Sequence, residues 1–189
     1  NYATLMYSDV SMSSTCEMVY NIIKDMDPNG FTPNISECLY TGIMTDTGSF
    51  RYPATTPATH RAIAHLIETG ASGTEIHQRI YDSASFSRLK LLGLTLSNLK
   101  QIPNLPVVYM TLSQKELNSC DYKKGDTEGF VNYGLSLEGI IFSCIMIENE
   151  NEGIIKISFR SQGEFSVNDF ARSYFNGGGH HNAAGGMAS

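Results

Sequence analysis

Residues 175–189 read FNGGGHHNAAGGMAS, a run of three glycines followed by two histidines and a second glycine-rich stretch. A glycine run adds no side chain to a core and loses the most backbone entropy on ordering. A flexible linker would be richer in serine and would not follow the aromatic-ended segment SYF, and an expression tag would not continue as NAAGG. The run therefore predicts a place where something comes very close to the backbone.

The glycine run does not match the two common nucleotide-binding motifs. A dinucleotide-binding G-x-G-x-x-G follows a strand and opens a helix, whereas this run follows a predicted helix. A phosphate-binding P-loop ends in Gly-Lys-Ser/Thr, which this run lacks. The successive N–H groups of Gly177, Gly178 and Gly179 instead predict a small anion-binding nest, with His180 or His181 adding a donor.

Arg160 lies in the β-rich run IIKISFRS, shortly before the glycines. Alternation along a strand places Ile155 and its apolar neighbours on one face and Arg160 on the other. A solvated outer face is the ordinary role of such an arginine. A guanidinium close to a bare backbone also suits a phosphate, which it holds through two parallel hydrogen bonds. The residues alone leave both interpretations open.

Asp46 follows an apolar helical face and lies among small polar residues in TGIMTDTGSF. A turn aspartate that caps its own loop is the ordinary interpretation. A hard carboxylate oxygen at the end of a rigid element is also what a divalent cation requires, although one carboxylate does not make a metal site. His60, His65 and His77 lie on predicted helices at spacings that do not share a face, which favours ordinary surface or core roles for them.

The composition is that of a globular protein with one large or two small domains. Of 189 residues, 41% are hydrophobic and 17% charged, and no apolar run is long enough to span a bilayer. The formal net charge is −6, so nucleic acid or phosphate is expected to bind at a local site rather than on a broad basic face. The four cysteines form no C-x-x-C pair, which indicates reduced, buried thiols in a cytoplasmic protein.

Apolar periodicity and capping residues make the first half of the chain mostly helical. A strand end is expected at the start, and helices are predicted over residues 13–26, 32–44, 56–70, 73–81 and 85–99. Ser14 and Glu17 form a capping-box pattern at the first helix. Thr-Pro pairs at Thr32 and Thr56 open two others.

A domain boundary is predicted near Gln101, where two prolines precede a β-branched run. The elements predicted after it are a strand over Val107–Leu112, helices from Ser113 and near Thr127–Tyr133, a hairpin of residues 139–148 and 153–161, and a helix over 166–175. The sequence thus predicts an α/β protein with residues 1–100 mostly helical and residues 101–189 α+β around a mixed sheet.

Three stretches together resemble one protein family. GGGHHNAAGG is similar to the Gly-Gly-Gly-His-x-x-Ala-Ala-Gly signature of the DHHA1 substrate-binding domain. YSDVSMSSTCEMVY and YTGIMTDTGSFRYPATTPATHRAIAHLIETGA resemble the later part of the DHH phosphoesterase domain that precedes it. KISFRSQGEFSVNDFARSYFNGGGHHNAAGG resembles the closing part of DHHA1 in the group of nano-RNA-degrading oligoribonucleases and 3′-phosphoadenosine-5′-phosphate (pAp) phosphatases. The resemblance covers nearly the whole chain.

The resemblance implies a bilobed, manganese-dependent phosphoesterase that hydrolyses short oligoribonucleotides, pAp or both at a two-ion centre. Residues 1–100 would be the C-terminal part of a DHH domain and residues 101–189 a DHHA1 domain. By this match Asp46 is a catalytic carboxylate that binds metal, while Arg160 and His180 hold the substrate's phosphate in a pocket shaped by Gly177, Gly178 and Gly179. The implied partners are a short RNA or nucleotide and no membrane, with a homodimer as a possible assembly in the cytoplasm.

The chain departs from the family on its amino-terminal side. The Asp-His-His triplet that names the family is absent, and so are the earlier metal-binding aspartates, which in the family lie upstream of the segment that resembles YSDVSMSS. We therefore expect the sequence to be part of a longer protein and its metal site to be incomplete. His181 and Asn182 fall at variable positions of the signature, so the resemblance gives them no role.

Other functions fit the same residues. An exopolyphosphatase or a cyclic-dinucleotide phosphodiesterase of the same superfamily would use a similar site. Base-stacking aromatic residues would favour nucleotides there, and additional lysines and arginines would favour polyphosphate. A nucleotide-binding module without catalysis is the alternative from a different class. The DHHA1-like domain of alanyl-tRNA synthetases is disfavoured, because it lacks the helical stretch that carries Asp46.

Overall fold

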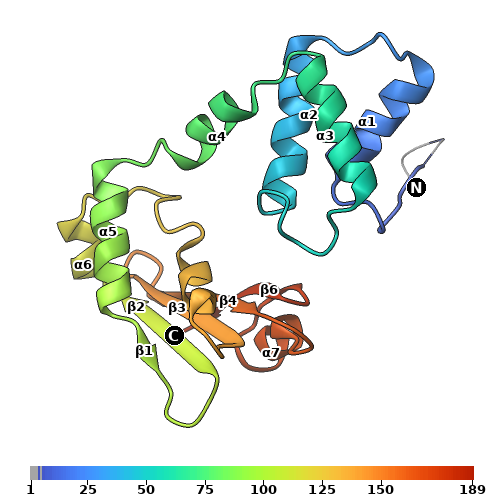
Figure 1. Ribbon diagram of the computed structural model, residues 1–189. Coiled ribbons are helices and arrows are strands. Elements are labelled where there is room, and N and C mark those ends of the chain that lie inside the picture. The colour runs from blue at the N-terminus through green and yellow to red at the C-terminus, as the bar shows by residue number, and fades with distance from the viewer. Residues whose placement is uncertain (1–3, 5) are drawn as a thin grey trace. The chain divides into compact units, whose positions relative to one another are not determined.

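The computed structural model of this protein describes residue 4 and residues 6–189, and it divides into two compact units (Figure 1). Unit 1 comprises residues 1–83 and unit 2 comprises residues 84–189. The strand end predicted for the start of the chain falls partly on residues 1–3 and 5, which lie outside the described residues. Residues 6–10 form no strand.

The helices of unit 1 begin where the sequence places a capping residue. They are α1 (Thr15–Met26), α2 (Pro33–Asp46), α3 (Pro57–Glu68) and α4 (Gly73–Tyr81). The hydroxyl of the serine or threonine before each helix accepts a backbone N–H of the first turn, and α2 and α3 start on a proline. Because such caps are local signals, the sequence predicts these helices correctly.

The core of unit 1 lies between α1, α2 and α3. It is formed mostly by large apolar side chains, among them Leu39, Ile43, Met44, Ile63 and Leu66. The Glu17 carboxylate is also buried, and it accepts a hydrogen bond of 3.0 Å from Thr59 Oγ1 on α3. Ser14 accepts the N–H of Glu17 as predicted, whereas the Glu17 carboxylate joins α1 to α3 instead of closing a capping box.

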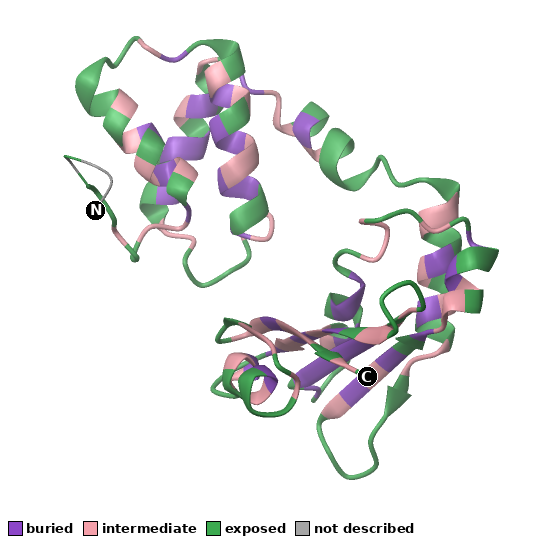
Figure 2. Cartoon of the chain, turned by 180° about the vertical axis from the view of Figure 1, so that it is seen from behind, coloured by how far each residue is buried: buried purple, intermediate pink, exposed green. Residues whose placement is uncertain are grey.

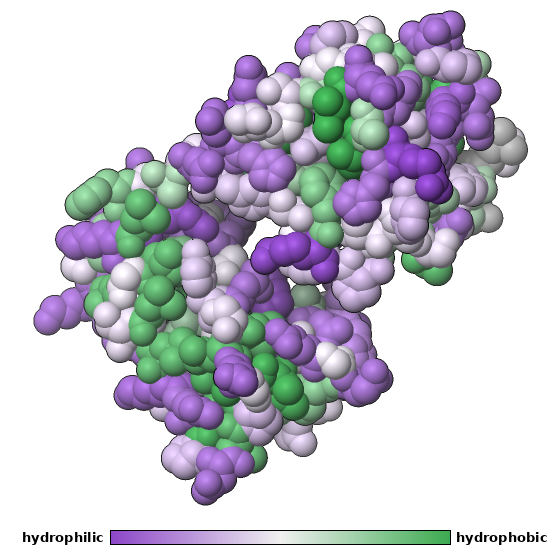
Figure 3. All heavy atoms as spheres, in the orientation of Figure 1, coloured by the Kyte–Doolittle hydropathy of each residue, from purple (hydrophilic) through white to green (hydrophobic). Residues whose placement is uncertain are grey.

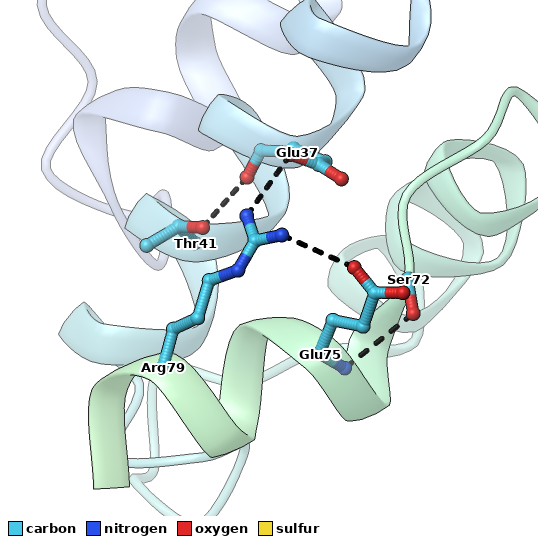
Figure 4. A network of polar contacts seen from close by, with 5 residues as sticks. All are labelled: Glu37, Thr41, Ser72, Glu75 and Arg79. Carbon is cyan, nitrogen blue, oxygen red and sulfur yellow. Dashed lines mark hydrogen bonds and ion pairs between the residues drawn. The ribbon is translucent and has the colours of Figure 1, made fainter. Parts of the chain in front are cut away.

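Arg79 joins α4 to α2 at the surface of unit 1 (Figure 4). Its guanidinium lies 3.2 Å from a carboxylate oxygen of Glu75 on its own helix and 3.8 Å from one of Glu37 on α2. Exposed pairs of this kind contribute at most about 1 kcal/mol each, because water screens them. The stronger attachment is Ile76, which is buried in the core of unit 1.

Unit 2 combines helices with a sheet. Its helices are α5 (Phe86–Ser97), α6 (Gln114–Ser119), the 3-10 helix η1 (Phe130–Ser136) and α7 (Val167–Tyr174). Its strands are β1 (Lys100–Gln101), β2 (Val107–Leu112), β3 (Phe142–Asn149), β4 (Ile154–Ser161), β5 (Gly178–His180) and β6 (Ala183–Ala188). The helix predicted near Thr127–Tyr133 is therefore a 3-10 helix that begins at Phe130. The glycine-rich end of the chain forms the two strands β5 and β6.

A six-stranded sheet with the order β1-β2-β3-β4-β6-β5 organises unit 2. Strands β2 and β3 are parallel and the other neighbouring pairs are antiparallel, so the sheet is mixed, as predicted. The hairpin predicted from the Asn-Glu-Asn-Glu-Gly turn is confirmed as β3 and β4. Figure 2 shows the central strands largely buried and much of the loop surface exposed.

The two units divide before α5, whereas the sequence places a boundary near Gln101. Leu91 of α5 is fully buried in a cluster with side chains of β2 and β3, and Arg88 donates to the carbonyl of Glu128 at 2.7 Å. The two prolines behind the predicted boundary lie in the loop between β1 and β2, which pair with each other. Here the prolines mark a turn within the sheet and not the start of a unit.

The two faces of the sheet carry different coverings. Helix α7 packs on one face, over a cluster that includes Phe142, Phe159 and Ala184. On the same face an apolar groove of about 610 Å³ runs over β2, β3 and β4. In Figure 3 hydrophobic atoms gather on the surface of unit 2 around β1 and β2. Side chains of α5, α6 and η1 pack on the opposite face over β2 and β3, in the cluster that includes Leu91 and Ile145.

The opposite face continues over β4, β6 and β5 with half-buried or exposed residues, and we name this part the open face. It consists of Lys156, Ser158 and Arg160 on β4, Ala183, Gly185 and Met187 on β6, and His180 on β5. Directly paired residues of antiparallel strands send their side chains to the same side of a sheet. The strand register therefore brings these residues to one surface.

The predictions on thiols and membrane spans have mixed outcomes. Cys120 and Cys144 are buried free thiols, as predicted, and burial raises the pKa of Cys144 to about 11. Cys38 is exposed, so the prediction that all the thiols are buried is wrong for this residue. In the part of the chain that the structure describes, no helix combines the length and the apolar character needed to cross a membrane.

Candidate functional site

Asp46 is the last residue of α2 and is exposed. Its carboxylate makes no hydrogen bond to any residue that the structure describes. The loop after it is held by Thr47, whose hydroxyl accepts the N–H of Phe50 at 3.0 Å and donates to the carbonyl of Ile43 at 2.7 Å. Thr47 therefore has the capping role that the ordinary interpretation gives to Asp46. A carboxylate at a helix C-terminus is also unfavourably placed in the field of the helix dipole.

The turn that follows Asp46 has an unusual backbone. Gly48, Ser49 and Phe50 are consecutive left-handed residues with φ of 56°, 60° and 66°. Left-handed geometry costs a residue with a side chain about 1–2 kcal/mol. At Gly48 a Cβ atom would lie 2.5 Å from the Tyr52 ring, so this position also requires glycine on steric grounds. Strained turns of this kind concentrate at functional sites, which supports a role for the adjacent Asp46.

His77 of α4 holds the strained turn from the side. Its Nε2 lies 2.9 Å from the Ser49 hydroxyl and its Nδ1 lies 2.8 Å from the Gly73 carbonyl. A carbonyl oxygen only accepts, so Nδ1 carries a proton, and in the neutral imidazole Nε2 accepts from the Ser49 hydroxyl. The sequence interpretation of His77 as an ordinary residue misses this contact, because the two partners are 28 positions apart and no local pattern connects them.

The described residues near Asp46 do not complete a metal centre. In residue 4 and residues 6–189 there is no group of three or more His, Cys, Asp or Glu side chains that could hold a metal ion. The negative charge of Asp46 does act on a neighbour. Burial raises the pKa of the Cys16 thiol, and the charges of Asp46 and Cys38 raise it further. Asp46 thus offers one hard oxygen donor to a cation, and a two-ion centre needs more.

In unit 2 the sheet register brings two of the predicted phosphate-binding residues into one row. Arg160 on β4 pairs with Ala183 on β6, and Ala183 pairs in turn with His180 on β5. Ser143 on β3 begins the row on the other side of Arg160, and its hydroxyl is engaged with the carbonyl of Val131 at 2.8 Å. Arg160 and His180 therefore flank the small side chain of Ala183 on the open face.

Arg160 is half-buried at the end of β4. Its Nη1 donates to the carbonyl of Phe159 at 2.9 Å, which fixes part of the guanidinium against the strand. A guanidinium has five N–H donors in one plane and is charged at any physiological pH. It thus has the donors and the permanent charge to hold a phosphate in a defined orientation.

The structure gives a different reason for the glycine run from the predicted close approach of a ligand. A Cβ atom on Gly177 would lie 1.9 Å from the carbonyl oxygen of Gly185, and one on Gly179 would lie 2.4 Å from that of Ala183. What comes close to these glycines is thus the chain's own strand β6. At Gly178 a Cβ atom would meet nothing nearer than 3.5 Å, an ordinary contact with the Arg172 side chain.

The predicted nest of unpaired N–H groups is wrong for two of the three glycines. The N–H of Gly177 donates to the carbonyl of Ala171 at 3.2 Å, and that of Gly179 donates to Asn168 Oδ1 at 2.9 Å. Both acceptors belong to α7, so these bonds fasten the hairpin β5–β6 to that helix. A contribution of Gly177, Gly178 and Gly179 to substrate binding stays a prediction, and it rests on their small size and not on free donors.

Asn182 has a structural role that the sequence did not reveal. Its side-chain amide donates to Ser161 Oγ at 2.9 Å and to the carbonyl of Gly163 at 3.1 Å. The neighbouring His181 carbonyl accepts the N–H of Val167 at 2.8 Å. The tip of the hairpin β5–β6 is thereby tied to the end of β4, next to Arg160. These ties keep His180 in its place relative to Arg160.

The surface beside the row carries only small side chains. Ser158 on β4 pairs with Gly185 on β6, and Gly185 pairs with Gly178 on β5. A Cβ atom on Gly185 would meet only the Ile157 carbonyl oxygen, at 3.5 Å, so this position has ordinary space around it. A ligand can therefore approach the strands closely beside Arg160 and His180.

Single alanine substitutions are expected to separate the structural glycines from the spacious ones. Gly177→Ala forces a backbone carbonyl to move and is expected to lower the free energy of unfolding by about 1–3 kcal/mol. Gly178→Ala, the matched control, is expected to change it little or to raise it by about 0.4–1 kcal/mol through the unfolded state. Urea denaturation measures both. Equal effects of the two substitutions would contradict the hairpin packing described above.

Comparisons with known proteins agree with this picture of unit 2. The family model of the DHHA1 domain matches residues 104–189. The bifunctional oligoribonuclease and PAP phosphatase NrnA of Bacillus subtilis (strain 168) is 29% identical over 97% of this chain and 58% of its own length. The protein of the same name from Thermus thermophilus is 32% identical over 94% of this chain and 52% of its own length.

A solved structure has the same fold over almost all of the chain. The crystal structure of an exopolyphosphatase-related protein from Bacteroides fragilis matches with a TM-score of 0.94 at 40% identity, over 98% of this chain and 54% of that one. The chain spans between 52% and 58% of the length of the two curated relatives above. Residues 104–189 thus match the DHHA1 domain, and nearly the whole chain is similar to about half the length of proteins named oligoribonuclease and PAP phosphatase NrnA.

Proposed function

We propose that this protein is a phosphoesterase that acts on short oligoribonucleotides, on pAp, or on both. The observation that carries the proposal is the row Arg160–Ala183–His180 on the open face, within the residues that match the DHHA1 domain. The names of the curated relatives support the same substrate class. The cytoplasmic location and the homodimer that the resemblance implies stay predictions.

In this proposal Arg160 and His180 hold a terminal phosphate of the substrate. The guanidinium supplies charge-assisted hydrogen bonds in a fixed plane, and the His180 ring adds a donor from the neighbouring strand pair. Ala183 and Gly185 leave space for the phosphate to reach both. The net charge of −6 disfavours binding of long nucleic acid, because long polymers need many cationic contacts. A local site of this kind suits very short substrates.

Asp46 is the proposed catalytic residue and a ligand of a manganese centre. Its exposed carboxylate, the strained turn after it and the absence of any hydrogen bond to another described residue leave its oxygens available to a cation. When bound, Mn²⁺ would supply Lewis-acid chemistry toward the phosphoryl group. The described part of the chain does not offer a complete ligand set, so further ligands are required for activity.

Hydrolysis of polyphosphate is the second candidate. The observation that favours it is the 40% identity to the exopolyphosphatase-related protein from Bacteroides fragilis. The two candidates differ in the ligand next to the terminal phosphate, which is a nucleoside in one case and another phosphate in the other. Competition between a 5′-phosphorylated diadenylate and tripolyphosphate for the same protein discriminates between them.

The complete gene product is expected to hydrolyse a diadenylate and pAp in the presence of Mn²⁺, and the 189-residue chain is expected not to. The physical reason is that Asp46 alone cannot hold two ions. Product formation is followed by chromatography for both proteins, with and without EDTA. Efficient turnover by the 189-residue chain, or turnover by the complete protein that resists EDTA, would contradict the proposal.

A further inference from the structure

We propose that the open face carries a second phosphate subsite at Lys156, which binds a phosphodiester further along the same oligonucleotide strand. The inference rests on the proposed function, because it takes Arg160 and His180 as the holders of the terminal phosphate. It adds a residue that sets the preferred length of the substrate. The ligand that such a surface recognises is a chain with phosphates at regular spacing.

Two cationic side chains lie on the same strand of the open face. Lys156 and Arg160 are four residues apart on β4, so their side chains point to the same face of the sheet. At about 3.3 Å per residue their Cα atoms are separated by about 13 Å. One phosphate does not cover this span, whereas the backbone of a short oligonucleotide does. The two cations are therefore spaced for different phosphates of one ligand.

The surface between the two cations belongs to β4 and β6. Ser158 lies between them on β4, and its partner on β6 is Gly185. Met187 pairs with Lys156 and is 48% exposed, so the far end of this path is also open to solvent. No large side chain of β4 or β6 stands on the path between the cations. A strand of nucleotides can therefore lie along β4 from Arg160 to Lys156.

Charged side chains lie near Lys156. Its Nζ lies 2.7 Å from a carboxylate oxygen of Glu152, and both side chains are about half exposed. The hydrogen bond from Lys156 lowers the pKa of the Glu152 carboxyl, and the charges of Lys156 and Lys124 lower it further. Two ammonium groups therefore lie near one carboxylate. A phosphodiester that approaches Lys156 competes with Glu152 for it, so Glu152 limits the strength of the subsite.

The subsite predicts a length-dependent effect of Lys156. The test measures dissociation constants of AMP and of 5′-phosphorylated di-, tri- and tetra-adenylate, in EDTA so that no hydrolysis occurs. Affinity is expected to rise from AMP to the longer ligands. Lys156→Gln should weaken the binding of the tri-adenylate by about two- to fivefold at low salt and leave AMP unchanged, as for one screened charge contact. The slope of log affinity against log salt should fall by about 0.7.

Two further variants sharpen the test. Lys100→Gln removes the same charge from β1, at the opposite edge of the sheet, and is the matched control that should change nothing. Glu152→Gln should strengthen the binding of the tri-adenylate and leave AMP unchanged, because the competing carboxylate is gone. A gain of affinity cannot come from general damage to the fold.

The outcomes separate this inference from the proposed function. Equal effects of Lys156→Gln on AMP and on the tri-adenylate, or no effect on either, would overturn the subsite. In that case a loss of AMP binding in Arg160→Ala would still support the proposed function. If Arg160→Ala leaves the binding of every ligand unchanged, both fail. The same measurements with tripolyphosphate identify the source of the phosphates. If tripolyphosphate binds more tightly than the tri-adenylate and loses as much affinity in Lys156→Gln, the oligonucleotide is overturned as the ligand.

Discussion

Replacing Asp46 by asparagine is expected to abolish turnover in the complete protein while the fold remains intact. An amide oxygen is a weaker ligand for a hard divalent cation than a carboxylate, so metal occupancy should fall together with the rate. In EDTA, where no bound metal adds stability, the free energy of unfolding should not fall, since the carboxylate makes no hydrogen bond to a described residue and lies at the unfavourable end of the α2 dipole. Removing its charge should stabilise by about 0.3–1 kcal/mol. Rate and bound manganese are measured together, and the melting temperature is measured in EDTA.

The adjacent Thr47 provides the control for this substitution. Thr47→Val removes the hydroxyl that holds the loop, and it should lower stability by about 1 kcal/mol or more, because the N–H of Phe50 loses its partner. Asp46→Asn and Thr47→Val thus have opposite expected effects on the melting temperature. If Asp46→Asn keeps the wild-type rate and manganese content, Asp46 is only a surface residue.

Replacing Arg160 by alanine is expected to lower kcat/KM by tens to several hundred-fold, or about 2–4 kcal/mol of transition-state stabilisation. The lost interaction is a charge-assisted contact to the substrate's phosphate, so manganese content should stay unchanged. Lysine at this position should restore only part of the activity, because a point charge does not reproduce the planar fork of donors. Steady-state kinetics on pAp and on a diadenylate measure the effect.

His180 and Arg172 frame the interpretation of this result. His180→Ala should cost less than Arg160→Ala, because the imidazole of an exposed residue is a weaker anion holder than a guanidinium. Arg172 is the matched control, since it is an exposed arginine on α7 that lies near Gly178. Loss of activity in Arg172→Ala that equals the loss in Arg160→Ala would argue against the open face as the phosphate site.

The helices of this protein can be predicted from the sequence, because the capping residues that mark them lie beside the helices they cap. Ser14, Thr32, Thr56 and Ser166 each cap a helix within three residues, and the structure has those helices. The glycine-rich end cannot be predicted in this way. The reason for a glycine at 177 is a carbonyl on another strand, and nothing within a few residues of it indicates that neighbour.

Only part of the candidate site can be predicted from the sequence. Composition and spacing single out Asp46 and Arg160 as chemically suitable residues, although they do not distinguish function from an ordinary surface role. The alignment of Arg160 with His180 depends on the register of β4, β6 and β5, which forms only when the sheet is assembled. The contact of His77 with Ser49 likewise joins helix α4 to the turn after α2, and no periodic pattern relates the two residues.

We propose that the open face of unit 2 binds the phosphate end of a short nucleotide substrate. Backbone amide shifts of the 189-residue chain, titrated with a 5′-phosphorylated diadenylate in EDTA, test it most directly. We expect the perturbed resonances to gather at Ser158, Arg160, His180, Ala183 and Gly185, and we expect Arg160→Ala to remove these changes. Shifts confined to the apolar groove on the α7 face, or no saturable shifts at all, would contradict it.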